Sequence, residues 1–412
     1  MKRGEGEATT EDGAAPGHWD RDLRGVGKLA IDATTSITSL VEAMHRGIVR
    51  PFSGDHDAGV GGISGLVYGS VRGITRGVGL GVDAALKLLA PALRGVPDVR
   101  GRDSVQSIVN GVMGDYLRRS GNPLALDMQW RVNGQVLTME PSSIMRAFGQ
   151  PGGRLLIMVH GLCMNDLRWQ REVAGGTHDH GLALQRDLGF TPVYLRYNTG
   201  LHVSTNGQLL AQALATLAAA WPVPIESISI VTHSMGGLVA RSACDQAERL
   251  GAPWRASLRR MVFIGTPHTG APLERGGRWI EVVLGSTPYA APLARLGRLR
   301  SDGITDLRYG SVSDADWQHG EHVEANVHPL PLPPDIACYA IAGTIGRDGA
   351  DLKGRLLGDG LVPLASALGR HRSARRSLAF PPGRTAVFAE TGHLALLGSP
   401  GVYGALRGFM SE

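Results

Sequence analysis

A serine near the middle of the chain has the neighbours that a catalytic nucleophile needs. Ser234 follows the apolar run 228–231 and precedes Gly236 and the helical pattern 237–241. In a tight turn between a strand and a helix, a serine presents its Oγ alone above the sheet, and small residues two positions before and after it relieve the crowding. Gly236 fills one of these positions, whereas Thr232 stands where glycine is usual. The segment predicts that Ser234 is a nucleophile.

Two later segments supply the partners that such a serine requires. A serine at neutral pH needs a histidine base, and a carboxylate must hold that histidine in one tautomer. Asp359 follows the predicted strand 336–342 after a linker, and His393 follows the predicted strand 385–389. Because the carboxyl ends of parallel strands meet at one edge of a sheet, we predict Asp359 as the acid and His393 as the base. The competing acids lie in a predicted cap and do not directly follow a strand: Asp302, Asp306, Asp314 and Asp316.

Two backbone N–H groups near the attacked carbonyl would complete the site. Such donors stabilise the oxyanion of a tetrahedral intermediate, and each is worth on the order of 10² to 10³ in rate. Met235 directly follows the nucleophile and is expected to supply one donor. The second donor should come from the loop after the predicted strand 155–159, where we predict Leu162, with Cys163 as the alternative.

The remaining histidines allow other interpretations. His233 adjoins Ser234 but points differently, so we expect it to pack beneath the turn and not to act as the base. His178 and His180 flank an aspartate, but no third ligand follows at a recognisable spacing, so no metal site is predicted. His268 either lines the pocket or makes a structural hydrogen bond. No metal or organic cofactor is expected.

The chain around these residues alternates between short apolar runs and helical stretches. This alternation predicts an α/β fold with a mainly parallel sheet flanked by helices. A hairpin is predicted around the turn Asn133-Gly134, and a helix over 104–119. The predicted strands of the sheet are 155–159, 192–197, 227–232, 260–264, 336–342 and 385–389.

Several segments are expected outside this sheet. Residues 1–24 are predicted to be a flexible tail and 25–120 a helical extension, followed by the main domain 121–412 with a cap insertion at about 271–335. Glycine recurs at every fourth position from 61 to 81, which makes one smooth helix face. This face either packs in a tight helical hairpin or contacts a membrane surface peripherally through residues 60–82.

Composition excludes several classes of protein. With 412 residues, 43% hydrophobic and 19% charged, the chain is long enough to bury a core and is not disordered throughout. The net charge is +5, but the basic residues form no tract, so no nucleic-acid partner is predicted. Three cysteines cannot all pair, and no secretory signal or bilayer-spanning run is found. We therefore expect a cytoplasmic protein, with peripheral membrane association as the alternative.

Together, the chemistry-bearing segments resemble those of the α/β-hydrolase superfamily. Within it, residues 125–412 resemble bacterial lipases and GPI inositol-deacylase-like lipases and esterases. The resemblance implies an α/β-hydrolase fold, the chain order serine, acid, histidine, and hydrolysis of carboxylic esters, with lipids or other hydrophobic acyl esters as substrates. The segments that carry it are 160–161, 232–237, 265–270, 359–360 and 392–393.

The sequence is also compatible with two alternatives to ester hydrolysis. The same three side chains serve an acyltransferase, in which an alcohol replaces water when the acyl group leaves the serine. The second alternative is a catalytically inactive scaffold at a membrane surface, with residues 26–95 as its working part. An intact set of Ser234, Asp359 and His393 speaks against the scaffold.

Overall fold

The computed structural model describes residues 99–271, 301–318, 327–328, 330–347 and 357–411. The chain divides into two compact units, residues 1–90 with 121–124 and residues 91–120 with 125–412. All elements described below belong to the second unit. The predicted tail 1–24 and the glycine-repeat segment 61–81 lie outside the described residues.

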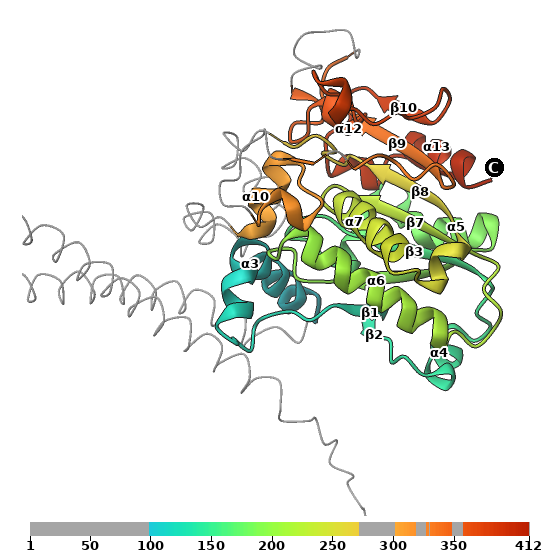
Figure 1. Cartoon of the computed structure of the whole chain (residues 1–412). Helices are drawn as coiled ribbons and strands as arrows, with labels where there is room; N and C mark the ends of the chain where they lie inside the picture. The colour runs from blue at the N-terminus through green and yellow to red at the C-terminus, as the bar shows by residue number, and fades with distance from the viewer. Residues whose placement is uncertain (1–98, 272–300, 319–326, 329, 348–356, 412) are drawn as a thin grey trace, which may run out of the picture. The chain divides into compact units, whose positions relative to one another are not determined.

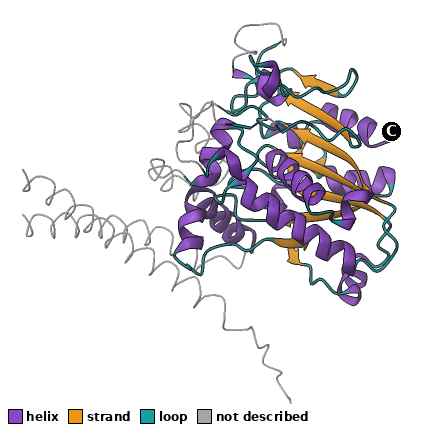
Figure 2. Ribbon diagram, viewed as in Figure 1, coloured by secondary structure: helices purple, strands orange, loops and turns teal. Residues whose placement is uncertain are grey.

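An eight-stranded sheet forms the centre of this unit (Figures 1 and 2). Its strand order is β10-β9-β8-β7-β3-β6-β1-β2, and only β1 and β2 run antiparallel to their neighbours. A separate hairpin pairs β4 (Arg171–Val173) with β5 (Gly176–His178). The strands of the large sheet are β1 (Gln129–Val132), β2 (Gln135–Val136), β3 (Arg154–Val159), β6 (Thr191–Arg196), β7 (Ser227–His233), β8 (Leu258–Ile264), β9 (Ala337–Gly343) and β10 (Thr385–Phe388).

Helices cover both faces of the sheet, with α6 and α7 on one face and α5 and α13 on the other (Figure 1). The α-helices are α3 (Val99–Arg119), α4 (Pro141–Phe148), α5 (His180–Leu188), α6 (Val203–Ala220), α7 (Gly236–Arg249), α10 (Asp302–Tyr309), α12 (Leu364–Ala367) and α13 (Pro400–Ser411). Short 3-10 helices include η1 (Asp166–Trp169), η2 (Pro253–Ser257), η4 (Asp314–Asp316), η6 (Ala374–Arg376) and η7 (Ala395–Leu397). None of these described helices has both the length and the apolar character that a bilayer span requires.

The predicted α/β-hydrolase fold, with its mainly parallel sheet between helices, is confirmed. Each of the six predicted strands is present within about two residues of its expected bounds, and the predicted helix 104–119 is α3. The central strands β3, β7 and β8 are buried on both faces, which explains why their sequences read as continuous apolar runs. The hairpin turns at Asn133 and Gly134, whose φ angles are 50° and 77°.

Helix α3, the described part of the predicted extension 25–120, is tied to the sheet by buried ion pairs. Asp103 Oδ2 lies 2.7 Å from Arg131 Nη1 on β1, and its Oδ1 lies 3.1 Å from Arg196 Nη2 on β6. All three side chains are nearly inaccessible to solvent. Separation of this extension from the main domain stays a prediction, because residues 25–98 lie outside the described part of the chain.

Removing this carboxylate should destabilise the fold strongly. We expect Asp103→Asn to lower the free energy of unfolding by about 3–5 kcal/mol, because two buried guanidinium groups lose the carboxylate that they share. Urea unfolding measures the loss. The control is Asp127→Asn, which removes an exposed ion pair with Arg118 and should cost less than about 1 kcal/mol. Equal losses in the two variants would contradict this account.

Candidate active site

Ser234 lies in a strained turn between β7 and α7. Its φ angle is 55°, in the left-handed region that residues other than glycine seldom adopt. Two backbone hydrogen bonds hold the turn: Ser234 N donates to Ile264 O at 2.8 Å, and Gly237 N donates to Ser234 O at 3.0 Å. The side chain is buried, and its Oγ makes no hydrogen bond to any residue that the structure describes. The hydroxyl is therefore held in place while its own hydrogen-bonding capacity is unused.

The two small-residue positions around Ser234 are used differently. A Cβ at Gly236 would lie 2.5 Å from Val159 O and 2.7 Å from His160 O, so a glycine is required there. Thr232, where glycine is usual, is buried and donates its Oγ1–H to Val262 O on β8 at 3.2 Å. Because the neighbouring strand accepts this hydroxyl, threonine is accommodated at the end of β7 and the turn keeps its form.

Asp359 and His393 form a buried pair. His393 Nδ1 lies 2.7 Å from Asp359 Oδ2, and both side chains are at most 1% exposed. The other carboxylate oxygen, Oδ1, accepts hydrogen bonds from Leu361 N at 3.0 Å and Val362 N at 2.8 Å. The backbone adds a further link, since His393 N donates to Asp359 O at 3.0 Å. The carboxylate is thus held by its own loop with one oxygen directed at the imidazole.

The His393 ring lies beside the turn that carries Ser234. Its centroid is 4.6 Å from that of His233, the residue before the serine. A Cβ on Gly265, after β8, would come within 3.2 Å of the His393 ring, so this glycine leaves the space that the imidazole fills. The three predicted residues therefore lie on the loops that follow strands β7, β9 and β10, at the carboxyl edge of the sheet.

His233 is engaged in holding the His393 loop. Its Nε2–H donates to His393 O at 3.2 Å, so its proton is committed to a backbone carbonyl. Burial, with the nearby His393 adding to it, moves the pKa of His233 well below its usual value, so the ring is neutral at pH 7. The sequence suggested that His233 packs beneath the turn; the hydrogen bond to His393 was missed, because residue 393 is far away in the sequence.

The predicted oxyanion donors also lie at this edge. Gly161 packs directly on the serine, since a Cβ there would be 2.8 Å from Ser234 Cβ. Within the described residues, neither Leu162 N nor Met235 N donates a hydrogen bond. The alternative donor, Cys163 N, is already bonded to Thr199 Oγ1 at 3.1 Å. Of the three candidate oxyanion donors, Leu162 N and Met235 N thus have no acceptor among the described residues.

The segment after β6 supports the oxyanion loop, a role that the sequence did not suggest for it. Tyr197 Oη donates to His160 O at 2.9 Å, and the two rings stack with centroids 4.6 Å apart. Burial raises the pKa of the Cys163 thiol to about 12, so this cysteine is not a nucleophile at pH 7. The signal that could have identified Tyr197 and Thr199 is their position directly after a predicted strand at the same edge.

His178 and His180 form a series of hydrogen bonds that ends on a backbone carbonyl. His180 Nε2 donates to Leu396 O at 3.0 Å, so its Nδ1 accepts from His178 Nε2 at 2.7 Å. Across the described parts of the chain, no group of three or more His, Cys, Asp or Glu side chains could hold a metal ion. These two hydrogen bonds link α5 to η7, which begins two residues after His393.

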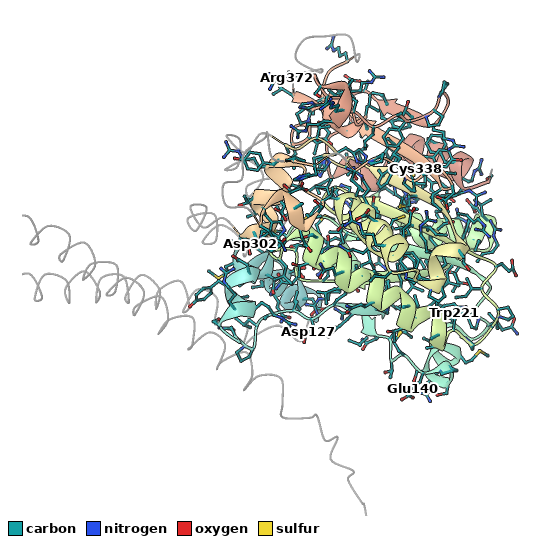
Figure 3. The ribbon with its side chains drawn as sticks, in the orientation of Figure 1. Asp127, Glu140, Trp221, Asp302, Cys338 and Arg372 are labelled. Atoms are coloured by element: carbon teal, nitrogen blue, oxygen red, sulfur yellow. The ribbon has the colours of Figure 1, made fainter. Side chains whose placement is uncertain are left out.

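The four competing acids have partners in and around the cap. Asp306 Oδ2 accepts from His202 Nδ1 at 3.0 Å, and Asp314 Oδ2 accepts from Gln208 Nε2 at 2.9 Å. Asp302, labelled beside α3 in Figure 3, lies 3.2 Å from an Arg119 nitrogen. Asp316 accepts from backbone N–H groups of its own loop. Asp359 is therefore the acid paired with His393.

The described part of the predicted cap lies against the loops of the site. A Cβ on Gly303, in α10, would come within 2.2 Å of Thr199 O and 2.9 Å of Met235 Cε. Residues 272–300 and 319–326 of the cap lie outside the described residues. The predicted apolar acyl pocket beneath the cap therefore stays a prediction.

Comparisons with known proteins agree with this fold. A family model described as a PGAP1-like alpha/beta domain matches residues 150–325. No curated protein matches the chain. Similar solved structures include the mature lipase BlEst2 from Bacillus licheniformis, with 17% identity over 64% of this chain and 93% of that one and a TM-score of 0.40. EstA from Clostridium botulinum has 13% identity over 66% and 90% of the two chains, with a TM-score of 0.38.

A fungal structure of the same kind is also similar. Lipase B from Aspergillus fumigatus has 11% identity over 62% of this chain and 52% of its own, with a TM-score of 0.37. The expected resemblance is confirmed at the level of the fold: the mostly parallel sheet between helices is of the α/β-hydrolase type, and residues 150–325 are similar to the PGAP1-like alpha/beta domain.

Proposed function

We propose that the protein hydrolyses carboxylic esters through an acyl-enzyme intermediate on Ser234. The observation that carries the proposal is the buried contact of 2.7 Å between Asp359 Oδ2 and His393 Nδ1, at the sheet edge where Ser234 occupies its left-handed turn. A carboxylate, an imidazole and a hydroxyl are the groups that serine hydrolysis requires.

In the acylation step, Ser234 Oγ attacks the ester carbonyl and its proton passes to His393 Nε2. Asp359 keeps the other ring proton on Nδ1 and stabilises the imidazolium that forms. The N–H groups of Leu162 and Met235 donate to the oxyanion of the tetrahedral intermediate. When the intermediate collapses, the ester C–O bond breaks and the departing alcohol takes the proton from His393.

In the deacylation step, a water molecule attacks the acyl carbon while His393 removes one of its protons. The second intermediate collapses, the carboxylic acid leaves, and Ser234 Oγ regains the proton. No cofactor takes part in either step. His393 carries each transferred proton in turn, and the two backbone N–H groups stabilise the oxyanion without losing their protons.

The substrate class that we propose is a lipid or another hydrophobic acyl ester. Two features support it: the resemblance of the segments 160–161, 232–237 and 392–393 to those of lipases, and the placement of α10 against Met235, beside the nucleophile. A cap over the site would exclude water and favour apolar acyl chains. We extend the proposal to a cytoplasmic location, with peripheral membrane contact through residues 60–82.

Hydrolysis of p-nitrophenyl esters with short, medium and long acyl chains tests the proposal. We expect release of p-nitrophenol, a preference among the three chains, and labelling of the protein by a fluorophosphonate probe. Added alcohol separates the two reactions of the acyl-enzyme, because an acyltransferase would form the new ester faster than the free acid. Absence of both hydrolysis and labelling would reject the proposal and favour the scaffold.

A further inference from the structure

A cavity lies beside α7, and none of the three proposed catalytic side chains lines it. Its volume is about 250 Å³. Its walls come from α7, the loop after β8, the loop after α10 and the segment around η6, and its lining includes Arg241, His268, Val312, Leu330, Arg375 and Arg376.

The buried floor of this cavity carries an arginine without an ion pair. Arg241 is 5% exposed and its Nη2 donates to Leu330 O, but its Nε has no partner among the described residues. Among the residues that the structure describes, no carboxylate oxygen lies within 4 Å of the Arg241 guanidinium. Burying a charged group without a counter-charge is costly.

The acid whose charge acts on Arg241 is Asp316, and it is committed to other groups. Its Oδ2 accepts from Val312 N and Ser313 N, and its Oδ1 accepts from His328 N at 2.7 Å. The side chain of Asp316 is fully buried. Both carboxylate oxygens of Asp316 therefore accept hydrogen bonds from backbone N–H groups, while the Arg241 side chain lines the cavity.

A neutral histidine adds a second buried group with unused hydrogen-bonding capacity. His268 is 4% exposed, and neither ring nitrogen has a partner among the described residues. Burial, with the positive charge of Arg241 adding to it, moves the pKa of His268 well below its usual value. At pH 7 the ring is neutral and offers one N–H donor and one acceptor.

Two further arginines line the same cavity. Arg375 is exposed, and Arg376 is half-buried with its Nη2 donating to Tyr309 O at 3.3 Å. Three guanidinium groups therefore line this cavity. A phosphate monoester carries about −1.5 to −2 charges at pH 7, which are attracted to these cations, and guanidinium groups match its oxygens with paired hydrogen bonds.

We propose that this cavity binds the phosphate group of a small phosphate monoester. Arg241 and Arg375 contact the phosphate oxygens, and His268 donates one hydrogen bond. Apolar side chains, among them Val312 and Leu330, contact the organic part of the ligand. Arg241 lies five residues after the first residue of α7, about 7.5 Å along the helix. None of the three proposed catalytic side chains lines the cavity, so the ligand lies outside the proposed catalytic centre.

Isothermal titration calorimetry of the full chain with phenyl phosphate tests this site. We expect saturable binding that weakens as NaCl is added. Arg375→Gln should raise Kd about 10-fold or more, because it removes a charge-assisted hydrogen bond from an exposed position where folding is not at risk. The control is Arg370→Gln, an exposed arginine of the same segment that does not line the cavity, and its Kd should stay within twofold of wild type.

Other ligands and variants identify the source of the phosphate. Weaker binding of inorganic phosphate than of phenyl phosphate supports an organic ester, and equal binding supports a site for the free anion. Arg241→Gln should abolish binding of either; if it fails to fold, Arg375→Gln still decides. Equal affinity for benzoate, an unchanged Kd in Arg375→Gln, or no binding would overturn the proposal.

The proposed phosphate site and the proposed ester hydrolysis can fail separately. Ser234→Ala should bind phenyl phosphate with an unchanged Kd, because Ser234 does not line the cavity. Loss of binding in this variant would place the phosphate in the catalytic centre and overturn the proposed site. Absence of ester hydrolysis, by contrast, would leave the binding experiment unaffected.

Discussion

Ser234→Ala is expected to lower kcat/KM for p-nitrophenyl esters by about 10⁴-fold or more. The variant removes the only atom that can form the acyl-enzyme, while the oxyanion donors and the buried pair of Asp359 and His393 remain. The small residual rate would come from a water molecule that attacks the bound ester directly. Steady-state kinetics and fluorophosphonate labelling measure the effect, and labelling should be abolished.

Ser229→Ala is the matched control for this experiment. Ser229 is a buried serine on β7, the strand that precedes the Ser234 turn, and its Oγ also has no partner among the described residues. Its replacement should leave kcat/KM within a few-fold of wild type. If Ser234→Ala retained activity or labelling, another residue would be the nucleophile and the proposed mechanism would be wrong.

Asp359→Asn is expected to lower kcat by about 10⁴-fold with little change in KM. The asparagine oxygen can still accept from Leu361 N and Val362 N, which directs its NH₂ group at His393 Nδ1. Because His393 Nδ1 then faces the NH₂ donor of the asparagine, Nδ1 must accept a hydrogen bond. The ring proton therefore moves to Nε2. His393 can no longer take the proton of Ser234, although the geometry of the site is preserved.

A cap acid provides the control for Asp359→Asn. Asp314→Asn removes the charge of a competing candidate whose carboxylate accepts from Gln208, and it should change kcat only a few-fold. Kinetics of both variants decide which carboxylate serves the base. A large loss in Asp314→Asn with normal activity in Asp359→Asn would assign the acid to the cap.

Much of the fold could be predicted because its signals are local. Strands β3, β7 and β8 are buried on both faces, so each is a short run of apolar residues in the sequence. The hairpin turn is encoded by two adjacent residues, Asn133 and Gly134, that tolerate positive φ. The turn of Ser234 is likewise encoded by its immediate neighbours. Thr232 is the exception, because its hydroxyl is accommodated by the carbonyl of Val262 on the neighbouring strand β8.

Local sequence patterns are enough to predict the elements, the nucleophile turn and the loops that carry an acid and a histidine. The pairings are visible only in the packed fold: Asp359 and not a cap acid contacts His393, His233 donates to the His393 loop, and Arg241 and Arg375 line one cavity. The physical reason is that backbone preferences and hydrophobic periodicity act over a few residues. Ion pairs and cavities depend instead on side chains that are brought together only when helices and strands pack.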